Sequence, residues 1–332
     1  MSHRYDGIVM FSGGLDSIAA VHLLKSQGLT LLALHYVLPF YSGLGFHHRK
    51  IRESADALGI PLKIIEEGDA FFRMVQSPRF GFGKNANPCL DCRIHRLSDA
   101  AEVMRENGAS FIATGEVIGQ RPKSQRKSCL DIIDTRTGLN DRILRPLSAL
   151  LLPPTEAERN GLVDRNKLLG ISGRSRNAQI VYAKANGLQY PSPAGGCILT
   201  NIASAQRYLK LVEKYSPVDL EDFKLIAYGR HFAINERCRL VIARDDRENT
   251  ILEKIISDTD LVFDLEDVPG PMGIGRGSFN EDDTATAASF VTRYSRARNR
   301  ERARVGVTKG TGEKKVIEVT PATASVCEAL RI

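Results

Sequence analysis

A glycine-rich turn between a short apolar run and a helical pattern is the feature that most constrains this fold. Residues 7–28 are GIVMFSGGLDSIAAVHLLKSQG. The run GIVMF predicts a buried strand, and residues 16–27 have apolar side chains at helical spacing. Glycines let backbone N–H groups approach an anion closely, and the start of a helix adds a partial positive charge. The turn therefore predicts a nucleotide-phosphate site made of the six residues Ser12, Gly13, Gly14, Leu15, Asp16 and Ser17.

Asp16 is an unusual residue for a phosphate site, because its carboxylate repels phosphate oxygens. A Mg²⁺ ion between the two anions removes this repulsion. The pattern thus predicts a nucleotide site that uses Mg²⁺. The alternative is that Asp16 only caps the helix after a glycine turn.

Strands and helices alternate through the first part of the chain. Beyond the first strand, apolar runs at residues 29–37, 61–67 and 110–115 predict strands, and helical patterns separate them. This alternation predicts an α/β fold with a Rossmann-like parallel sheet. After residues 216–222, which resemble a linker, short strands predominate, the first at residues 223–229, with a helix near residues 285–298. We therefore expect two domains, 1–215 and a smaller α+β domain at 216–332.

The net charge of the 332-residue chain is +7, and part of it is concentrated at residues 120–127 and 293–304. Either run alone is consistent with a solvated helix face, but two runs on a basic chain favour a polyanionic partner. No apolar run approaches the length of a membrane span, and the start MSHRYDG lacks the features of a signal peptide. We expect a cytoplasmic protein without a membrane partner.

Three of the six cysteines stand in distinctive contexts. Cys89 and Cys92 lie one turn apart where a helix is expected to begin, so both sulfurs can reach one metal. Cys197 follows two glycines far along the chain. If His95 or Cys129 supplies a fourth ligand, the site is structural zinc; otherwise one position stays open for an external ligand such as sulfide.

The motifs, taken in order, resemble a known enzyme group. SGGLDS resembles the pyrophosphate loop of the N-type ATP pyrophosphatases, whose fold is the adenine nucleotide alpha hydrolase type. NPCLDC, ATGEVIGQRPKSQ, RPLSALLLP and PAGGCILT, within residues 5–215, resemble the cluster-dependent tRNA thiouridine synthetases related to 4-thiouridine synthetase and 2-thiouridylase.

This resemblance implies an ATP- and Mg²⁺-dependent tRNA sulfurtransferase that adenylates a uridine oxygen and replaces it with sulfur. Cys89, Cys92 and Cys197 would hold a [4Fe–4S] cluster carrying the sulfide, and Asp16 would be catalytic. In a cluster-free alternative, Cys197 carries a persulfide that Cys92 or Cys89 resolves as a disulfide. The sulfur comes from sulfide or a donor protein; the sequence determines neither the 2-thio or 4-thio product, nor the tRNA position, nor the oligomeric state.

The segment ATGEVIGQRPKSQ follows a later strand on the same sheet edge. Thr114 and Gly115 are expected to contact the nucleotide. Arg121 and Lys123 are expected to neutralise the triphosphate or the RNA backbone. A basic surface loop without a ligand is the alternative.

Residues 223–321 resemble the NFACT-R RNA-binding domain, although Val262 and Asp264 replace its Trp and His. Expected phosphate contacts come from the basic residues Arg230, His231, Arg244, Arg247, Arg276, Arg293, Arg296 and Arg298. Phe232 and Tyr294 are expected to stack on bases. The alternative for this domain is an accessory stabilising role. For the whole chain, the alternatives are a non-catalytic RNA-binding adaptor that retains an ATP-sensing loop and an enzyme that joins a different nucleophile, such as an amine, to activated RNA.

Overall fold

The computed structural model describes residues 5–41, 46–192, 197–310 and 312–332. The chain divides into two compact units, Met1–Cys197 and Ile198–Ile332. Helix α8 (Ile202–Tyr215) belongs to the second unit, whereas the sequence assigned it to the first. The reason is its contacts: Arg207 donates a hydrogen bond to the Ile226 carbonyl at 2.6 Å, and the Tyr215 hydroxyl donates one to the Asn235 carbonyl at 2.7 Å.

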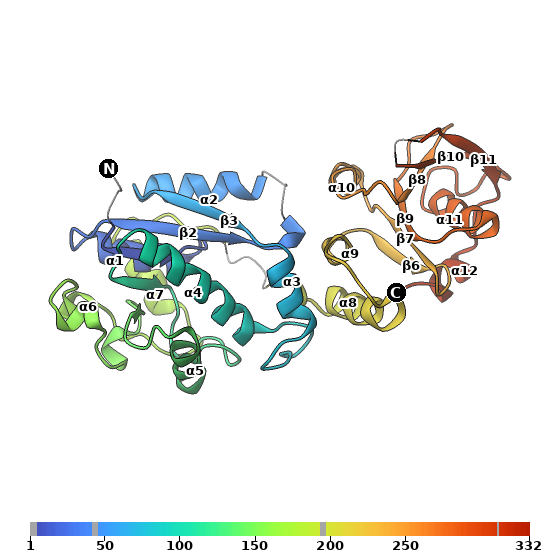
Figure 1. The fold of residues 1–332 in the computed structure, drawn as a ribbon. Coiled ribbons are helices and arrows are strands. Elements are labelled where there is room, and N and C mark those ends of the chain that lie inside the picture. Colours follow the sequence, from blue (N-terminus) through green and yellow to red (C-terminus); the bar gives the residue numbers. More distant parts are fainter. Residues whose placement is uncertain (1–4, 42–45, 193–196, 311) are drawn as a thin grey trace. The chain divides into compact units, whose positions relative to one another are not determined.

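The first unit is built on a five-stranded parallel sheet (Figure 1), with the strand order β3-β2-β1-β4-β5. The strands are β1 (Gly7–Met10), β2 (Leu31–Val37), β3 (Leu62–Glu66), β4 (Phe111–Thr114) and β5 (Ile143–Leu144). The prediction of a Rossmann-like parallel sheet is therefore confirmed. The glycine-rich turn of residues 12–17, called here the phosphate-type turn, follows β1, the central strand of this sheet.

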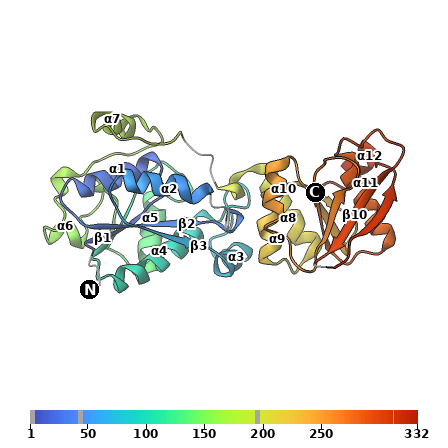
Figure 2. The ribbon, with the colours of Figure 1, turned by 90° about the horizontal axis from the view of Figure 1, so that it is seen from above.

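Helices cover both faces of the sheet, because successive side chains of the buried strand β1 point to opposite faces. Val9 and Phe11 pack with α1 (Leu15–Lys25), α2 (Phe46–Ala57) and α6 (Glu156–Arg159). Ile8 and Met10 pack with α4 (Cys89–Glu106) and α5 (Lys127–Thr137). Figure 2 shows α1, α2 and α7 (Asn177–Ala185) on the side opposite α4. The remaining elements of this unit are α3 (Asp69–Gln76) and the short 3-10 helices η1 (Pro39–Tyr41), η2 (Ala149–Leu151) and η3 (Arg165–Lys167).

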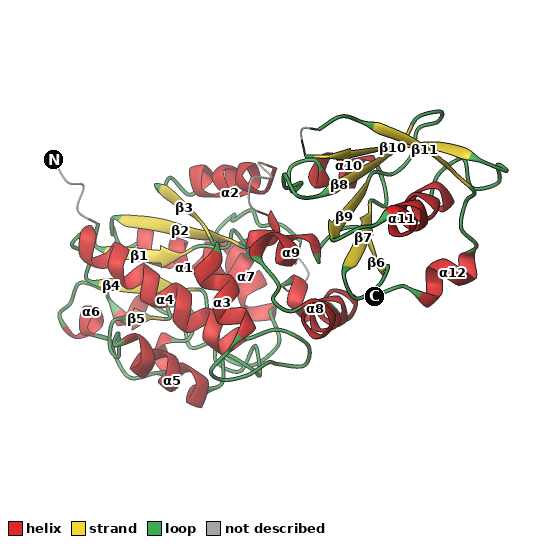
Figure 3. Ribbon diagram, turned by 45° about the vertical axis from the view of Figure 1, so that its right-hand side comes forward, coloured by secondary structure: helices red, strands yellow, loops and turns green. Residues whose placement is uncertain are grey.

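The second unit is a six-stranded antiparallel sheet with helices, which confirms the predicted α+β class. Its order is β11-β10-β8-β9-β7-β6. The strands are β6 (Arg230–Ala233), β7 (Cys238–Ile242), β8 (Leu261–Leu265), β9 (Gly273–Gly277), β10 (Ala303–Lys309) and β11 (Lys315–Val319). Its other helices are η4 (Ile198–Thr200), α9 (Leu220–Leu225), α10 (Asp246–Leu252), α11 (Glu281–Arg293) and α12 (Ala324–Ala329). Figure 3 shows α11 against the sheet, where Phe290 and Val291 enter the core.

The strand predicted at residues 223–229 is wrong, because α9 occupies its first part. Asp219 caps this helix: its side chain accepts a hydrogen bond from the Asp222 N–H at 2.7 Å, and the Asp222 side chain accepts one from the Asp219 N–H. This reciprocal capping starts a helix where the apolar run alone suggested a strand. Within the described ranges, no helix has the length and apolar character needed to cross a membrane.

Candidate active site

The turn after β1 has the geometry expected of an anion site. Gly13 adopts a positive φ of 68°, and Gly14 is the N-cap of α1. The Ser17 hydroxyl donates to the Gly14 carbonyl at 2.9 Å and lies 3.2 Å from the Ser12 hydroxyl. Because Gly14 has no side chain to cap the helix, the first N–H groups of α1 make no side-chain cap bond. These groups are suited to bind phosphate oxygens.

Asp16 lies inside the first turn of α1, so the alternative of an N-cap aspartate is wrong. Its Oδ2 atom accepts hydrogen bonds from Gln120 Nε2 at 3.0 Å and from Arg176 Nη2 at 3.3 Å. Its Oδ1 atom is buried and has no hydrogen-bond partner among the described residues. A carboxylate fixed by one oxygen, with the other unpaired, fits a cation that binds through oxygen, as Mg²⁺ does.

The two residues that hold Asp16 come from distant segments, and the sequence did not identify them as site residues. Arg176 stands at the N-terminus of α7, and its ion pair with Asp16 spans 160 positions of the chain. Gln120 is held in turn by the buried Gln179, whose Nε2 lies 3.4 Å from Gln120 Oε1. The expected segment 113–125 therefore does reach the turn after β1, through Gln120.

Thr114 and Gly115 lie next to the same turn. Thr114 ends β4 and pairs in register with Met10, the last residue of β1. A Cβ atom added to Gly115 would lie 2.7 Å from both the Asp16 carbonyl carbon and the Ser17 nitrogen. The close approach of β4 to the start of α1 therefore requires glycine here.

We expect Gly115→Ala to raise the KM for ATP at least about tenfold, because the methyl group must displace the backbone that presents Asp16 and Ser17. Gly68→Ala is the matched control, since a Cβ there meets no atom within 4 Å. ATP-dependent pyrophosphate release measures the effect. An unchanged KM in Gly115→Ala would contradict a nucleotide site at this turn.

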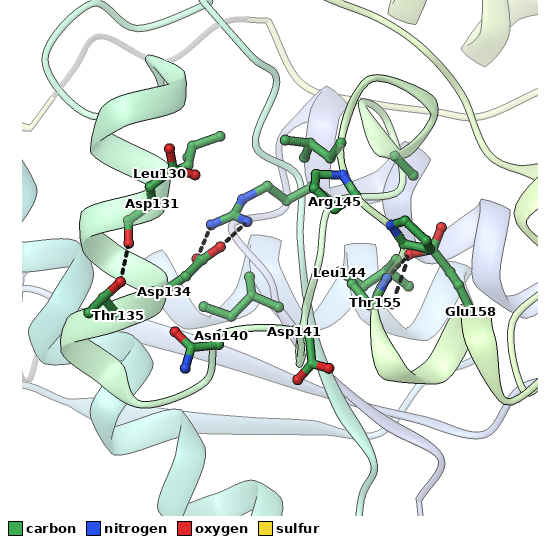
Figure 4. A pocket seen from close by; sticks show the side chains of 15 residues that line it. Leu130, Asp131, Asp134, Thr135, Asn140, Asp141, Leu144, Arg145, Thr155 and Glu158 are labelled. Carbon is green, nitrogen blue, oxygen red and sulfur yellow. Dashed lines mark hydrogen bonds and ion pairs between the residues drawn. The ribbon is translucent and has the colours of Figure 1, made fainter.

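Arg145, from the segment RPLSALLLP, has a structural role in this molecule. Its guanidinium is buried and binds the Asp134 carboxylate through two hydrogen bonds at 3.0 and 2.6 Å, and Glu116 at 3.2 Å. Figure 4 shows this pair at a pocket of about 240 Å³ whose lining includes none of the predicted site residues. Glu116 also pairs with Arg93 of α4 at 3.3 Å, so the network connects α4 to the segment after β4.

Cys89 and Cys92 occupy the first turn of α4, as predicted. Asn87 Nδ2 donates a hydrogen bond to Cys89 Sγ at 3.1 Å. Burial raises the pKa of the Cys92 thiol, and the nearby Arg96 opposes this shift. Asp91 fixes the preceding loop, because its carboxylate accepts hydrogen bonds from the N–H groups of Arg79 and Phe80 at 2.9 and 3.1 Å. The two thiols therefore stand on a well-anchored helix start.

Arg96 lies within electrostatic range of both Cys92 and Cys197. Its guanidinium binds Glu67 at 3.0 and 2.5 Å and lies over the ring of Tyr36, 5.6 Å from its centroid. Burial acts to lower the pKa of Arg96, but Cys92, Glu67 and Cys197 outweigh it, so the pKa is raised. Arg96 is thus within electrostatic range of sulfur atoms from two segments more than one hundred residues apart.

Arg121 lies within electrostatic range of both Cys89 and Asp16. Partial burial of its guanidinium, together with Arg93 and Arg176, lowers its pKa, while Cys89 and Asp16 oppose the shift. Arg121 therefore interacts electrostatically with a residue of each predicted half-site. Lys123 lies two residues after Arg121 and is exposed.

The described side chains include no group of three or more Cys, His, Asp and Glu arranged around a potential metal ion. The proposed zinc ligands have other contacts: His95 pairs with Glu67 at 3.8 Å, and the Cys129 thiol lies 3.8 Å from the Lys123 carbonyl. Gly195 and Gly196, expected to fold tightly before Cys197, lie outside the described residues. In the described structure, the three thiols thus lie near Arg96 or Arg121 but are not arranged around a common metal position.

The predicted RNA-binding residues of the second unit differ in exposure. Arg296 and Arg298 are exposed after α11, and Arg293 is the last residue of that helix. Arg230 begins β6, and its guanidinium carbon lies 4.8 Å from the centroid of the Tyr294 ring.

Three expected RNA contacts of this unit are corrected by the structure. Phe232 is fully buried against Phe290, so it cannot stack on a base. Arg276 is buried in ion pairs with Asp222 and Asp260. His231 is buried, and desolvation lowers its pKa to about 3, so the ring is neutral and bound to backbone carbonyls. All three are buried because both faces of the sheet are covered: Phe232 packs on α11, whereas His231 and Arg276 contact α9.

Different known proteins are similar to different parts of the chain. Residues 229–330 match the family described as NFACT protein RNA binding domain. The chain is 32% identical over 129 residues to the tRNA-specific 2-thiouridylase MnmA of Bradyrhizobium sp. (strain ORS 278), a match covering 34% of this chain and 32% of that protein. It is 33% identical over 114 residues to the enzyme of the same name from Sulfurimonas denitrificans, covering 32% of this chain and 33% of that protein. The chain thus spans about a third of the length of these relatives.

A solved structure with a weaker likeness is the U34-tRNA thiolase NcsA from Methanococcus maripaludis with its [4Fe-4S] cluster. It is 15% identical, covers 65% of this chain and 68% of its own, and superposes with a TM-score of 0.35. This likeness is too low to carry an argument about function. The sequence similarity thus connects part of the chain with tRNA-specific 2-thiouridylases and residues 229–330 with an RNA-binding domain.

Proposed function

We propose that this chain is an ATP-dependent tRNA sulfurtransferase that adenylates a uridine oxygen and replaces it with sulfur. One observation carries the proposal: the buried, unpaired Oδ1 of Asp16 at the phosphate-type turn lies in the same unit as Cys89 and Cys92 at the start of α4 and as Cys197. The phosphate-type turn and three thiols are therefore gathered in one unit. The similarity to tRNA-specific 2-thiouridylases and to an RNA-binding domain supports tRNA as the substrate.

ATP would bind with its phosphates at residues 12–17 and with Thr114 and Gly115 next to the nucleotide. The unpaired Oδ1 of Asp16 would hold Mg²⁺, which neutralises the phosphates. Arg121 and Arg176 add fixed positive charge beside the same carboxylate. The uridine oxygen attacks the α-phosphate, and pyrophosphate leaves. The uridine carbon is then joined to AMP through this oxygen, and sulfur transfer breaks the carbon–oxygen bond. Lys123 would contact phosphate of the nucleotide or the RNA.

The thiols of Cys89, Cys92 and Cys197 would supply the sulfur. In the more specific form of this proposal, the three thiols hold a [4Fe–4S] cluster, which when bound supplies the sulfide that displaces AMP. Because the described side chains are not arranged around a metal ion, the three thiols would have to come together when the cluster binds. Free sulfide or a donor protein would renew the sulfur.

The second unit would bind the tRNA, with Arg230, Arg293, Arg296 and Arg298 as phosphate contacts. Three of these residues are at or after the end of α11, in the basic run of residues 293–304. Arginine suits this task, because its planar group pairs with two phosphate oxygens at once.

Nucleoside analysis tests the proposal directly. The purified chain is incubated with tRNA, sulfide, a reductant and ATP·Mg²⁺, and the digested nucleosides are analysed by mass spectrometry. We expect thiouridine that depends on ATP, and its chromatographic position distinguishes the 2-thio from the 4-thio product. Thiouridine formed equally without ATP, or pyrophosphate release without any change in the RNA, would contradict the proposal.

A further inference from the structure

Four arginines from elements that are distant in sequence lie in one region of the second unit. They are Arg207 of α8, Arg230 of β6, Arg244 after β7 and Arg331 near the C-terminus, called here the arginine cluster. The carbonyls of the consecutive residues Ile226 and Ala227 accept hydrogen bonds from Arg207 and Arg244, at 2.6 and 3.4 Å. The Ala243 carbonyl, next to Arg244, accepts one from Arg230 at 2.9 Å.

Arg331 joins this group through the backbone. It forms an isolated β-bridge with Phe232, two residues after Arg230 on β6, so both arginines lie at the same edge of the sheet. Tyr294 lies under the Arg230 guanidinium, with 4.8 Å between the guanidinium carbon and the ring centroid. The ring also packs on Phe232, at 5.7 Å between centroids, so the position of the ring under Arg230 is fixed by packing.

The positive charge of the cluster is only partly compensated. Arg244 pairs with Glu248, and Arg331 pairs with Glu328 at 3.0 Å. In the described part of the chain, neither Arg207 nor Arg230 forms an ion pair with a carboxylate, and Arg207 Nε is buried without an acceptor.

Burial and, to a smaller extent, neighbouring arginines disfavour the charged form of Arg207 and Arg230. Burial together with Arg244 and Arg331 lowers the pKa of Arg207 to about 10. Burial is also the main cause of the lowered pKa of Arg230, to which Arg331 and Arg244 contribute. Folding alone does not need this arrangement, because hydrogen bonds to carbonyls can be made by uncharged side chains. An anionic ligand would remove the repulsion and supply the missing acceptor.

We propose that the arginine cluster is the site where this chain binds a backbone phosphate of RNA, with Arg207 and Arg230 as the two principal donors. The inference rests on the proposed RNA-binding function of the second unit. It assigns the tight phosphate contact to this sheet edge, apart from the exposed arginines after α11. The half-exposed Arg244 and Arg331 leave the site open to a ligand as large as a nucleic acid.

The test is binding of a fluorescent tRNA transcript to the full chain, followed by anisotropy between about 50 and 200 mM salt. We expect Arg207→Gln and Arg230→Gln each to weaken binding about tenfold and to lower the slope of log affinity against log salt by about one. Arg207→Lys should recover most of the loss, because it keeps the charge. Thermal unfolding of each variant shows whether it is folded.

The matched control is Arg237→Gln, which removes one exposed, ion-paired arginine of the same unit that lies outside the basic run of residues 293–304. Its affinity should change less than about twofold. Equal losses in the control and the cluster variants, or unchanged binding in folded cluster variants, overturn the site while leaving the proposed enzyme intact. A requirement for a 5′-terminal phosphate on the transcript also overturns it, since the proposal specifies the backbone. Failure of the enzyme proposal appears separately, as absence of thiouridine with normal RNA binding.

Discussion

Replacing Asp16 by Asn should slow ATP-dependent pyrophosphate release about 1000-fold, which corresponds to about 4 kcal/mol of transition-state stabilisation. The Oδ2 atom is already satisfied by Gln120 and Arg176, so the buried Oδ1 atom is the one that can take a metal ion. In the Asp16→Asn variant the amide oxygen must still face the two donors. The amide nitrogen then occupies the metal position and repels the cation.

Asp56→Asn, an exposed carboxylate on α2, is the control for loss of one negative charge in the same unit. Its pyrophosphate release should stay within about twofold of the wild-type rate. Thermal unfolding should show that the Asp16→Asn substitution is tolerated, since the contacts to Gln120 and Arg176 remain. If the Asp16→Asn chain keeps more than a tenth of the wild-type rate, the carboxylate does not hold the catalytic metal.

Strands β1 to β4 of the first unit could be predicted because they are apolar and the helices between them have clear periodicity. β9 could not, because its sequence GIGRG is mostly glycine and has Ile274 as its one β-branched residue. Tertiary packing explains it: a Cβ at Gly273 would lie 2.6 Å from the Val291 side chain, and one at Gly275 would lie 2.8 Å from the Phe279 ring. These glycines are needed by the packing of α11 and the neighbouring rings, which local sequence does not show.

In the candidate site too, some residues could be predicted from the sequence and others could not. Asp16, Cys89 and Cys92 stand in short contiguous motifs, so their positions could be predicted. Arg176 and Arg96 could not, because their partners are assembled only by folding. GRSRNAQ gave no indication that Arg176 would reach Asp16, and LDCRIHR gave none that Arg96 would bind Glu67. Arg276 is expected among the RNA contacts from its residue type alone, and the sequence does not show that it is buried in ion pairs with Asp222 and Asp260.

Separate Cys89→Ser, Cys92→Ser and Cys197→Ser variants should reduce thiouridine formation more than about 100-fold while pyrophosphate release stays within about threefold. Serine keeps the size of the side chain but does not provide a sulfur nucleophile or a soft metal ligand. Adenylation depends on the turn after β1, whereas sulfur transfer depends on the thiols, so the two half-reactions should separate. Thiouridine analysis and pyrophosphate release on the same samples measure both.

Cys129→Ser is the matched control, because this cysteine lies on α5 in the same unit and is not among the thiols that Arg96 and Arg121 share in the described structure. It should keep near wild-type thiolation. Iron and sulfide analysis after anaerobic reconstitution then separates the two sulfur routes. The cluster proposal requires about four iron atoms per chain in the wild type and their loss in each of the three serine variants. A wild-type chain that makes thiouridine without iron, with a persulfide on Cys197 by mass spectrometry, would instead establish the relay, because Cys92 or Cys89 must then close a disulfide as the sulfur leaves.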